Sequence, residues 1–533
     1  MNYKVCILAA GKGTRVSHAN GFNKALLPVG DKSALSHIID KFPKSVEVVI
    51  AVGHNAGLIR DFVKVAYTNR KITLVKVDKF EGKGSGPGHS LNYCRKHLQC
   101  PFIFTSADTI VLETIPEPSR NWLGVAEADN SEDYCMASVH EGLVKAFFIK
   151  MPMIELLSRC DDPKNILNNA FIGMAGVYDY KAFWQGFTKH HARVRGEVQV
   201  MDGLEELIKN PLYTHSFTWF DTGNDANYYK TCKHFNDSNF LVKPDEFLYF
   251  EDDRVIKYFA DKEIIKNRAY RAGVLKGIAP KLLNCTDNFY SYKYIDGLTL
   301  NKIEESAVFE KFLTFCQSKL WREITLNKAQ RREFDRAVRR FYFDKTHHRL
   351  EKFWAETGIK DVAGTINGIK TPKLKQLLDK IDWEDLLHGT PGMFHGDLQP
   401  ENIIVRKNSF VLIDWRHDFG GLLDYGDIYY DFAKLYHALL VSGEVIRKEE
   451  FSVRQENGSV HYNYLLKNNL LEFKTIFEKF LTYNGHSVKK VKILASLVFL
   501  NIAPLHHYPY NAFLYYLGKD MLHKTLTTSK HDH

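Results

Sequence analysis

The chain has 533 residues, of which 45% are hydrophobic and 25% are charged, a composition that is ordinary for a soluble globular protein. Its net charge of +9 is mild, and lysine and arginine are dispersed along the chain, which argues against a nucleic-acid partner. The eight cysteines form no CxxC pair, so we expect reduced thiols in a cytoplasmic protein, without a disulfide framework or a zinc site.

No insertion into a membrane is expected, because the longest apolar run, residues 493–505, is too short and too polar to cross a bilayer. Residues 1–11 predict a buried strand rather than a signal peptide, since glycine and charge interrupt the apolar residues at once. A chain of this length suggests about two to four domains.

The N-terminal part alternates short apolar segments with helical stretches. Strands are expected at residues 5–10, 46–52, 72–77 and 101–106, with helices between them, for example at 33–41 and 88–97. Because short apolar segments are typical of parallel strands buried on both faces, this alternation predicts a doubly wound, Rossmann-like α/β domain. Ligands bind such domains at the carboxyl ends of the strands.

Two glycine-rich loops follow strands at that edge. The first glycine loop, residues 11–15, contains Gly11, Gly13 and Arg15, and its backbone N–H groups can cradle phosphates while Lys24 adds positive charge nearby. The second glycine loop, residues 82–88, contains Gly84 and Gly86 and opens a helix. Taken alone, such a loop is more often only a tight turn.

Two isolated carboxylates complete this part of the chain. Asp108 ends the strand at 102–106, and Asp221 follows a run of aromatic residues. A single aspartate at the end of a strand is more often a helix cap. Two carboxylates from different strands, however, can hold one Mg²⁺ against the phosphates of a nucleotide.

Together, the segments LAAGKGTR, NKALLPVG, TSAD and FDTGNDANYY resemble the nucleoside-triphosphate transferases that activate sugar phosphates and phosphocholine. The resemblance implies that the first glycine loop holds the triphosphate, Lys24 stabilises charge on the α-phosphate, and the second glycine loop faces the base. It also implies that Asp108 and Asp221 bind Mg²⁺. Asn23 stands where the family usually has proline, which leaves the local turn open.

The acceptor must approach the α-phosphorus opposite the leaving pyrophosphate. We therefore expect Asn169 and Glu197, which lie between these motifs, to line the acceptor pocket, although ordinary sheet and loop positions explain them equally well. A short polar stretch at 235–239 marks the expected boundary between a nucleotidyltransferase domain, residues 1–235, and a second domain, residues 240–533.

The second domain begins with a predicted hairpin, residues 247–250 and 254–259. Lys257 lies inside its second strand between apolar residues, where a lysine can pair with the α- and β-phosphates of a nucleotide, and Glu263 on the next helix can orient it. A surface lysine is the alternative interpretation.

Farther along the chain, the sequence HGDLQPEN is followed by IDWR. Asp397 lies where a base can take the proton of an attacking hydroxyl, and Asn402 and Asp414 offer hard oxygen ligands to Mg²⁺. Apolar segments at 403–405 and 411–413 predict two short strands that bring both ligands together. A turn capped by the HxD pair is the structural alternative.

With Lys257 in VIKYF and the later segment YYDFAKL, these motifs resemble the aminoglycoside phosphotransferase and choline kinase family. The resemblance implies a two-lobed, protein-kinase-like α+β domain that uses ATP, with Asp397 as catalytic base. No glycine-rich loop covers the phosphates, because Glu251, Asp252 and Asp253 occupy the turn of the hairpin.

The combined prediction is a bifunctional enzyme that uses Mg²⁺ at both sites. The kinase would phosphorylate a small alcohol with ATP, and the N-terminal domain would transfer a nucleotidyl group, most simply CMP from CTP, to that phosphate. The product would be an activated headgroup for a surface polysaccharide or lipid. Choline, ethanolamine or a sugar fits as acceptor, and a non-catalytic kinase-like module is the rival from another class. The nucleotide, the oligomeric state and any channelling stay open.

Overall fold

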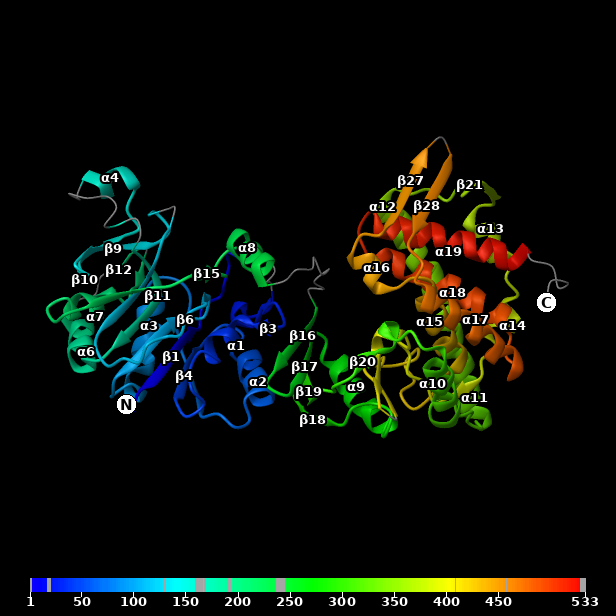
Figure 1. Ribbon diagram of the computed structural model, residues 1–533, viewed down its shortest axis with the longest axis horizontal. Helices are drawn as coiled ribbons and strands as arrows, with labels where there is room; N and C mark the ends of the chain where they lie inside the picture. Colours follow the sequence, from blue (N-terminus) through cyan, green and yellow to red (C-terminus); the bar gives the residue numbers. More distant parts are fainter. Residues whose placement is uncertain are drawn as a thin grey trace. The chain divides into compact units, whose positions relative to one another are not determined.

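The computed structural model describes residues 2–16, 21–128, 131–158, 166, 169–189, 193–194, 196–235, 245–407, 409–456 and 458–527. The chain divides into two compact units. The first unit comprises Met1–Ala260 with Leu283–Ser291, and the second comprises Asp261–Leu282 with Tyr292–His533. Figure 1 labels many of the helices and strands of both units.

The first unit is built on a nine-stranded sheet with the order β5-β4-β1-β6-β11-β8-β14-β10-β9. Its parallel part consists of β1 (Lys4–Ala9), β4 (Glu47–Val52), β5 (Ile72–Lys76) and β6 (Phe102–Ser106). The remaining strands are β8 (Trp122–Ala126), β9 (Cys135–His140), β10 (Leu143–Ile149), β11 (Ala170–Val177) and β14 (Tyr213–Ser216). The four predicted strands are therefore present and adjacent.

Successive residues of each strand point to opposite faces of this sheet, so the sheet carries two separate cores. Val5, Ile7 and Ala9 belong to one core, whereas Cys6 and Leu8 belong to the other. Helices α1 (Ala34–Ile39) and α2 (Ala56–Ala66) cover the first face, and α3 (Pro87–Cys94), α6 (Tyr180–Lys189) and α7 (Met201–Leu207) cover the second. Helices on both faces confirm the doubly wound arrangement.

A smaller sheet of four strands packs onto the first core. Its order is β16-β17-β19-β18, with β16 (Glu246–Glu251), β17 (Arg254–Phe259), β19 (Phe289–Lys293) and β18 (Leu282–Cys285). The Phe22 ring lies 5.0 Å from that of Phe247 and 4.7 Å from that of Tyr258, and the Tyr249 hydroxyl donates to the Leu26 carbonyl at 2.7 Å. The hairpin predicted to open the second domain is thus part of the first compact unit.

Of the boundary stretch predicted at 235–239, residues 236–239 lie outside the described residues. The functional division into residues 1–235 and 240–533 stays a prediction. The compact unit continues beyond that point because the aromatic face of the hairpin completes the core beside α2.

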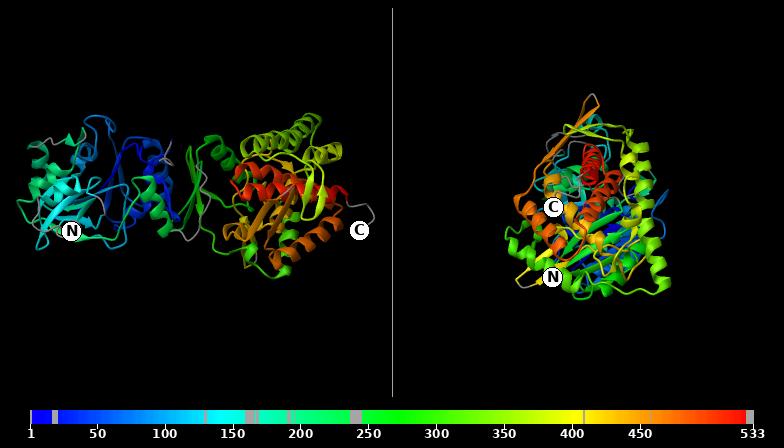
Figure 2. Two further views of the ribbon diagram at one scale, coloured as in Figure 1. Left: turned by 90° about the horizontal axis from the view of Figure 1, so that it is seen from above. Right: turned by 90° about the vertical axis from the view of Figure 1, so that its right-hand side faces the viewer.

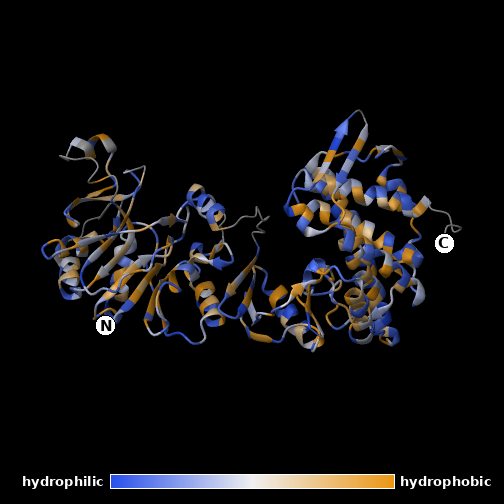
Figure 3. Cartoon of the chain, in the orientation of Figure 1, coloured by the Kyte–Doolittle hydropathy of each residue, from blue (hydrophilic) through white to orange (hydrophobic). Residues whose placement is uncertain are grey.

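The second unit is mainly helical. Its longer helices are α9 (Lys262–Val274), α10 (Ser306–Lys319), α11 (Lys328–Arg339), α12 (Lys345–Thr357), α15 (Ile428–Leu440), α17 (Asn468–Tyr483), α18 (Val488–Ile502) and α19 (Tyr510–Thr527). Helix α18 packs against α15 and α19 (Figures 1 and 2). Apolar residues follow α18 through most of its length, as Figure 3 shows in orange, and ten of its residues from Lys490 to Leu500 are buried. Among the described residues, no helix combines the length and apolar character needed to cross a membrane.

Short strands carry the predicted catalytic region. Strands β24 (Ile403–Arg406) and β25 (Ser409–Leu412) pair antiparallel, as predicted, and β20 (Leu298–Thr299) pairs with β24. A separate four-stranded sheet contains β21 (Gly364–Ile366), β22 (Ile369–Thr371), β27 (Phe451–Glu456) and β28 (Ser459–Tyr464).

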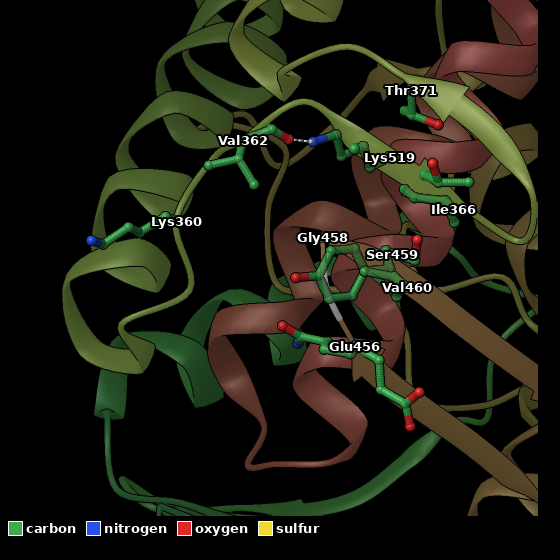
Figure 4. A pocket seen from close by; sticks show the side chains of 13 residues that line it. Lys360, Val362, Ile366, Thr371, Glu456, Gly458, Ser459, Val460 and Lys519 are labelled. Carbon is green, nitrogen blue, oxygen red and sulfur yellow. Dashed lines mark hydrogen bonds between the residues drawn. The ribbon is translucent and has the colours of Figure 1, made fainter.

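A cavity of about 190 Å³ lies between this separate sheet and α19 (Figure 4). Lys519 points toward it and donates to the Val362 carbonyl at 2.8 Å. None of the predicted site residues lines this cavity, and it is smaller than most ligand sites.

Candidate active sites

The first glycine loop follows β1 directly and is fixed by the segment that carries Lys24. Gly13 has a φ of +69°, and a Cβ at this position would lie 3.2 Å from three carbons of the Lys24 side chain. Asn23 is buried; its amide donates to the His54 carbonyl at 2.8 Å and its oxygen accepts from Ala25 N at 3.0 Å. Asparagine therefore supplies the turn before Lys24 where the resembled family has proline.

Lys24 and Asp108 form an ion pair at the carboxyl end of the parallel strands. Lys24 Nζ lies 2.5 Å from Asp108 Oδ2, with side-chain exposures of 16% and 14%. Burial opposes the ionisation of Asp108, but the charges of Lys24 and Arg15 outweigh it and lower the pKa of Asp108 to about 2. Asp108 is thus a carboxylate at any physiological pH.

Asp221 lies beside Asp108 because β15 (Trp219–Asp221) pairs with β7 (Thr109–Val111). Its carboxylate accepts from Asn227 Nδ2 at 2.7 Å, from Tyr134 Oη at 3.2 Å and from Gly223 N at 2.7 Å. Burial and the charge of Asp108 raise the pKa of Asp221. A cation near the two carboxylates, Asp108 and Asp221, would therefore stabilise their ionised forms.

Gly223 marks the point at which these groups converge. A Cβ there would lie 2.8 Å from Asp221 Oδ1, 3.0 Å from Asp108 Oδ2 and 3.7 Å from Arg15 Nη2. The structure therefore brings together Asp108, Asp221 and Arg15, and the roles predicted for them stay predictions. The two carboxylates suit Mg²⁺, which takes further oxygen ligands from phosphates and water.

The second glycine loop is fixed by the segment that contains Glu197. Gly84 N donates to the Gly196 carbonyl at 2.7 Å, and a Cβ on Gly86, whose φ is +121°, would lie 2.6 Å from the Val198 carbonyl oxygen. Lys12 of the first glycine loop pairs with Glu81 at 3.1 Å, so both loops lie at one edge of the sheet. The glycines allow the backbone of this loop to approach the backbone at residues 196–198 closely. Contact of the loop with the nucleotide base stays a prediction.

The predicted acceptor residues lie on two different elements. Asn169 precedes β11, and its carbonyl accepts from Ala137 N at 2.9 Å. Glu197, on β13 (Glu197–Val198), is exposed. Their role in binding an acceptor stays a prediction.

Lys257 and Glu263 each form an ion pair with a different residue. Lys257 is 7% exposed on β17 and lies 3.7 Å from Glu246 of the neighbouring strand. Glu263 is exposed at the start of α9 and lies 3.3 Å from Lys266. The proposed contact between Lys257 and Glu263 stays a prediction.

In the second unit, Asp397 and Asn402 lie within one tight loop, residues 395–402. Asn402 Nδ2 donates to the Asp397 carbonyl at 2.9 Å and to Asp397 Oδ2 at 3.3 Å. Lys434 on α15 forms an ion pair with Asp397 Oδ1 at 2.8 Å. Burial opposes ionisation of Asp397, yet the charge of Lys434 outweighs it and lowers the pKa of Asp397. The proposed base is therefore ionised and ready to accept a proton.

Asp414 is connected to this loop through the backbone and through His395. Ile413 N donates to the Asn402 carbonyl at 2.9 Å, and His395 Nε2 donates to the Ile413 carbonyl at 3.0 Å. Burial lowers the pKa of His395 to about 4, so its ring is neutral and fixes both segments. Asp414 has a φ of +59° and pairs with Arg268 at 2.5 Å. A left-handed aspartate held in this way is typical of functional sites.

Buried polar residues hold the backbone of the loop at residues 395–402 and of neighbouring segments through hydrogen bonds. Asp431 accepts from His395 N at 2.7 Å and from Gly396 N at 2.6 Å. Arg271 is fully buried and donates to the carbonyls of Phe394, His395, Arg416 and Leu423. These contacts hold the backbone of the loop in one conformation.

Sequence reasoning missed several of these residues. Lys434 stands in a buried helix of mainly apolar and aromatic residues, and that position was a usable signal for a buried ion pair. Arg268 and Arg271 are spaced so that both face the same side of α9, but many surface helices share this pattern. Asn227 lies within the segment FDTGNDANYY, but nothing there marks it as a partner of Asp221, and Tyr134 carries no local signal.

Two family models match separate parts of the chain. Residues 5–166 match the MobA-like NTP transferase domain, and residues 317–452 match the phosphotransferase enzyme family. The first segment contains Lys24 and Asp108, and the second contains Asp397, Asn402 and Asp414. These matches confirm the predicted nucleotidyltransferase and kinase-like domains.

Relatives are similar to the N-terminal part. The chain is 26% identical over 209 residues to a bifunctional protein GlmU from Methanococcus maripaludis, covering 38% of this chain and 46% of that protein. It is 32% identical over 114 residues to a GlmU from Clostridioides difficile, covering 21% of each. The chain thus spans less than half the length of these curated relatives. A solved CTP:phosphocholine cytidylyltransferase from Streptococcus pneumoniae is 15% identical and has a TM-score of 0.35. The match covers 44% of this chain and 100% of that chain.

Proposed function

We propose that this chain is a bifunctional enzyme that phosphorylates a small alcohol with ATP and then transfers a nucleotidyl group to the new phosphate. The observation that carries the proposal is that each unit holds its own constellation of reactive groups. Lys24, Arg15 and Asp108 converge in the first unit, and Asp397, Asn402 and Asp414 share one loop system in the second.

In the kinase step, the hydroxyl oxygen of the alcohol attacks the γ-phosphorus of ATP, and the bond to the β,γ-bridging oxygen breaks so that ADP leaves. Asp397 receives the hydroxyl proton, and its ion pair with Lys434 at 2.8 Å holds the carboxylate in position. Positioning and charge stabilisation do most of the catalytic work in such a transfer.

In the second step, an oxygen of the new phosphate attacks the α-phosphorus of a nucleoside triphosphate, and pyrophosphate leaves. Lys24 and Arg15 stabilise the negative charge that builds on the α-phosphate. Asp108 holds Lys24 in place through their ion pair. The N–H groups of the first glycine loop bind the triphosphate, so the reaction needs no covalent enzyme intermediate.

The side chains present suit Mg²⁺ in both units: Asp108 with Asp221, and Asn402 with Asp414. When bound, Mg²⁺ neutralises charge on the phosphates. Among the described residues, no group of three or more histidine, cysteine, aspartate or glutamate side chains forms a metal cage. Two protein ligands per ion agree with sites that rely on nucleotide phosphates for the rest.

For the substrates, the motif resemblances support CTP as the nucleotide and an amino alcohol or a sugar as the acceptor. The product is then an activated headgroup for a surface polysaccharide or a lipid, made in the cytoplasm, where ATP and CTP are available. Joining both steps in one chain raises the local concentration of the intermediate.

A second candidate treats the kinase-like part as a non-catalytic regulatory module. The arrangement of Asp397 favours catalysis instead, because a buried lysine keeps this carboxylate ionised beside the two proposed Mg²⁺ ligands. A module without catalysis has no need for such an arrangement.

Paired substitutions separate the two activities. Asp397→Asn should abolish ADP formation with a pool of alcohols and sugars, while pyrophosphate release from the four nucleoside triphosphates with the corresponding phosphates continues. Lys24→Ala should give the reverse pattern. If Asp397→Asn leaves ADP formation unchanged, or if one substitution removes both activities from a folded protein, the proposed division is wrong.

A further inference from the structure

A pocket of about 310 Å³ lies next to the proposed base in the second unit. Arg340, Phe341, Lys345, Arg416 and Asp418 line it, and we call it the basic pocket. Arg416 N donates to the His395 carbonyl at 3.0 Å, and a Cβ on Gly396 would lie 2.6 Å from Arg416 Cβ. Arg416, which lines the basic pocket, therefore contacts the two residues that precede Asp397.

Positive charge in the basic pocket exceeds negative charge. Three of its lining residues are cationic, and Asp418 is its one carboxylate. That carboxylate already accepts from Gly421 N at 2.8 Å and lies 3.8 Å from Arg416 Nε. Within the described part of the chain, neither Arg340 nor Lys345 forms a salt bridge. Arg340 instead donates to the Gly420 carbonyl at 2.6 Å, so among the described residues no salt bridge neutralises these two cations and an oxyanion can do so.

Two cationic side chains of the protein already lie against the aromatic ring of the basic pocket. Lys345 Nζ lies 4.0 Å from the centroid of the Phe341 ring, and the Arg416 guanidinium carbon lies 4.9 Å from it. A quaternary or primary ammonium group binds at the same places on an aromatic ring. A cationic amino alcohol would have to displace these side chains and then face their charges.

Local geometry indicates that this arrangement has a function. Arg340 and Phe341 belong to a π-helical segment, Arg340–Asp344, inserted between α11 and α12. Such insertions occur frequently at functional sites. Burial, together with the charges of Arg416, Arg349 and Lys434, lowers the pKa of Lys345 well below its usual value. Crowding these cations costs free energy that a bound anion would recover.

We propose that the acceptor of the kinase step is an alcohol that also carries an oxyanion, either a carboxylate or a phosphate. Arg340, Lys345 and Arg416 bind that oxyanion while a hydroxyl of the same molecule lies at Asp397. The inference rests on the proposed kinase function and narrows its substrate class. It favours a sugar acid or a phosphorylated polyol over choline or ethanolamine.

Matched acceptors test this assignment. ADP formation is measured with glycerol, choline, glycerate and glycerol 3-phosphate, and with glucose, gluconate and glucose 6-phosphate. An anionic member of each set should give at least a tenfold higher kcat/KM than its neutral or cationic counterpart, and comparison of carboxylate with phosphate identifies the oxyanion. If choline or the neutral alcohols are consumed in preference to the anionic acceptors, the inferred oxyanion is wrong but the proposed kinase function stands. If no acceptor gives ADP, the proposed kinase function itself is contradicted.

A variant pair isolates the basic pocket. Lys345→Met should raise the KM for the anionic acceptor at least tenfold, with kcat and the KM for ATP nearly unchanged, and Lys345→Arg should restore most of the affinity. The control is Lys352→Met on the same helix, because Lys352 is half exposed and lies 3.7 Å from Glu356. An equal KM in wild type and Lys345→Met overturns the proposal.

A binding measurement makes the test independent of the true acceptor. Titration calorimetry with inorganic phosphate should show one site fewer, or at least tenfold weaker binding at one site, in Lys345→Met than in wild type. Equal binding by both proteins overturns the assignment even if the kinase is active.

Discussion

Replacement of Gly223 by alanine tests whether Asp108 and Asp221 act as one unit. The added methyl carbon would lie 2.8 Å from Asp221 Oδ1 and 3.0 Å from Asp108 Oδ2, whereas ordinary contacts begin near 3.4 Å. The carboxylates must therefore shift by about 0.6 Å and 0.4 Å. Neither shift is free, because Asn227 and Tyr134 hold Asp221 and Lys24 holds Asp108. Misplacement on this scale should lower nucleotidyl transfer by about ten- to a hundredfold.

The assay is pyrophosphate release from nucleoside triphosphates with phosphorylated acceptors, and ADP formation by the same preparation reports the kinase. ADP formation should be unchanged in Gly223→Ala. The matched control is Gly57→Ala on α2, where the nearest atom to the new methyl group is Arg60 Nη2 at 3.7 Å. Both variants should stay folded, but only Gly223→Ala should lose pyrophosphate release. If its rate stays within twofold of wild type, the two carboxylates do not define the reacting point.

Two further substitutions test buried carboxyl groups that support the fold and the loop of Asp397. Burial, reinforced by Asp40, raises the pKa of Glu251 from 4.5 to about 8, so the folded chain keeps a proton that the unfolded chain releases and stability falls as pH rises through this window. At pH 9, the free energy of unfolding of Glu251→Gln should therefore exceed that of wild type by a few kcal/mol, at about 1.4 kcal/mol per pKa unit, so the variant unfolds at a higher urea concentration. At pH 4, both proteins should unfold at nearly the same concentration. An equal difference at both pH values would refute this. Asp431→Ala removes the acceptor for His395 N and Gly396 N, so ADP formation should fall at least a hundredfold while pyrophosphate release persists. Retained ADP formation in Asp431→Ala would show that the loop does not depend on this contact.

The elements that depend on local pattern could be predicted from the sequence. Strand β1 and the glycine loop after it follow from a short apolar segment that ends in glycines. The pairing of β24 with β25 follows from two apolar segments separated by a short turn. Asp397, Asn402 and Asp414 could be selected as candidates because their types and spacing match the needs of phosphoryl transfer.

The pairing of distant segments does not follow from local pattern, and only the family resemblance placed Asp108 and Asp221 together. Asp221 reaches Asp108 only through the pairing of β15 with β7, and no local pattern specifies that pairing. The hairpin packs into the first unit through Phe247, Tyr249 and Tyr258, whose aromatic character is visible in the sequence but whose partners are not. The basic pocket combines a π-helical turn with residues that follow Asp414, so its charges could not be brought together from sequence alone.

The most direct test asks whether the product of the Asp397 site is the substrate of the Asp108 site. Asp397→Asn and Asp108→Asn are each incubated with pooled alcohols, ATP, Mg²⁺ and the four nucleoside triphosphates, separately and mixed, and the products are followed by mass spectrometry. Asp108→Asn alone should accumulate a phosphorylated alcohol, Asp397→Asn alone should yield nothing, and the mixture should form the nucleotidylated alcohol. Formation of that product by Asp397→Asn alone at the wild-type rate would contradict the account.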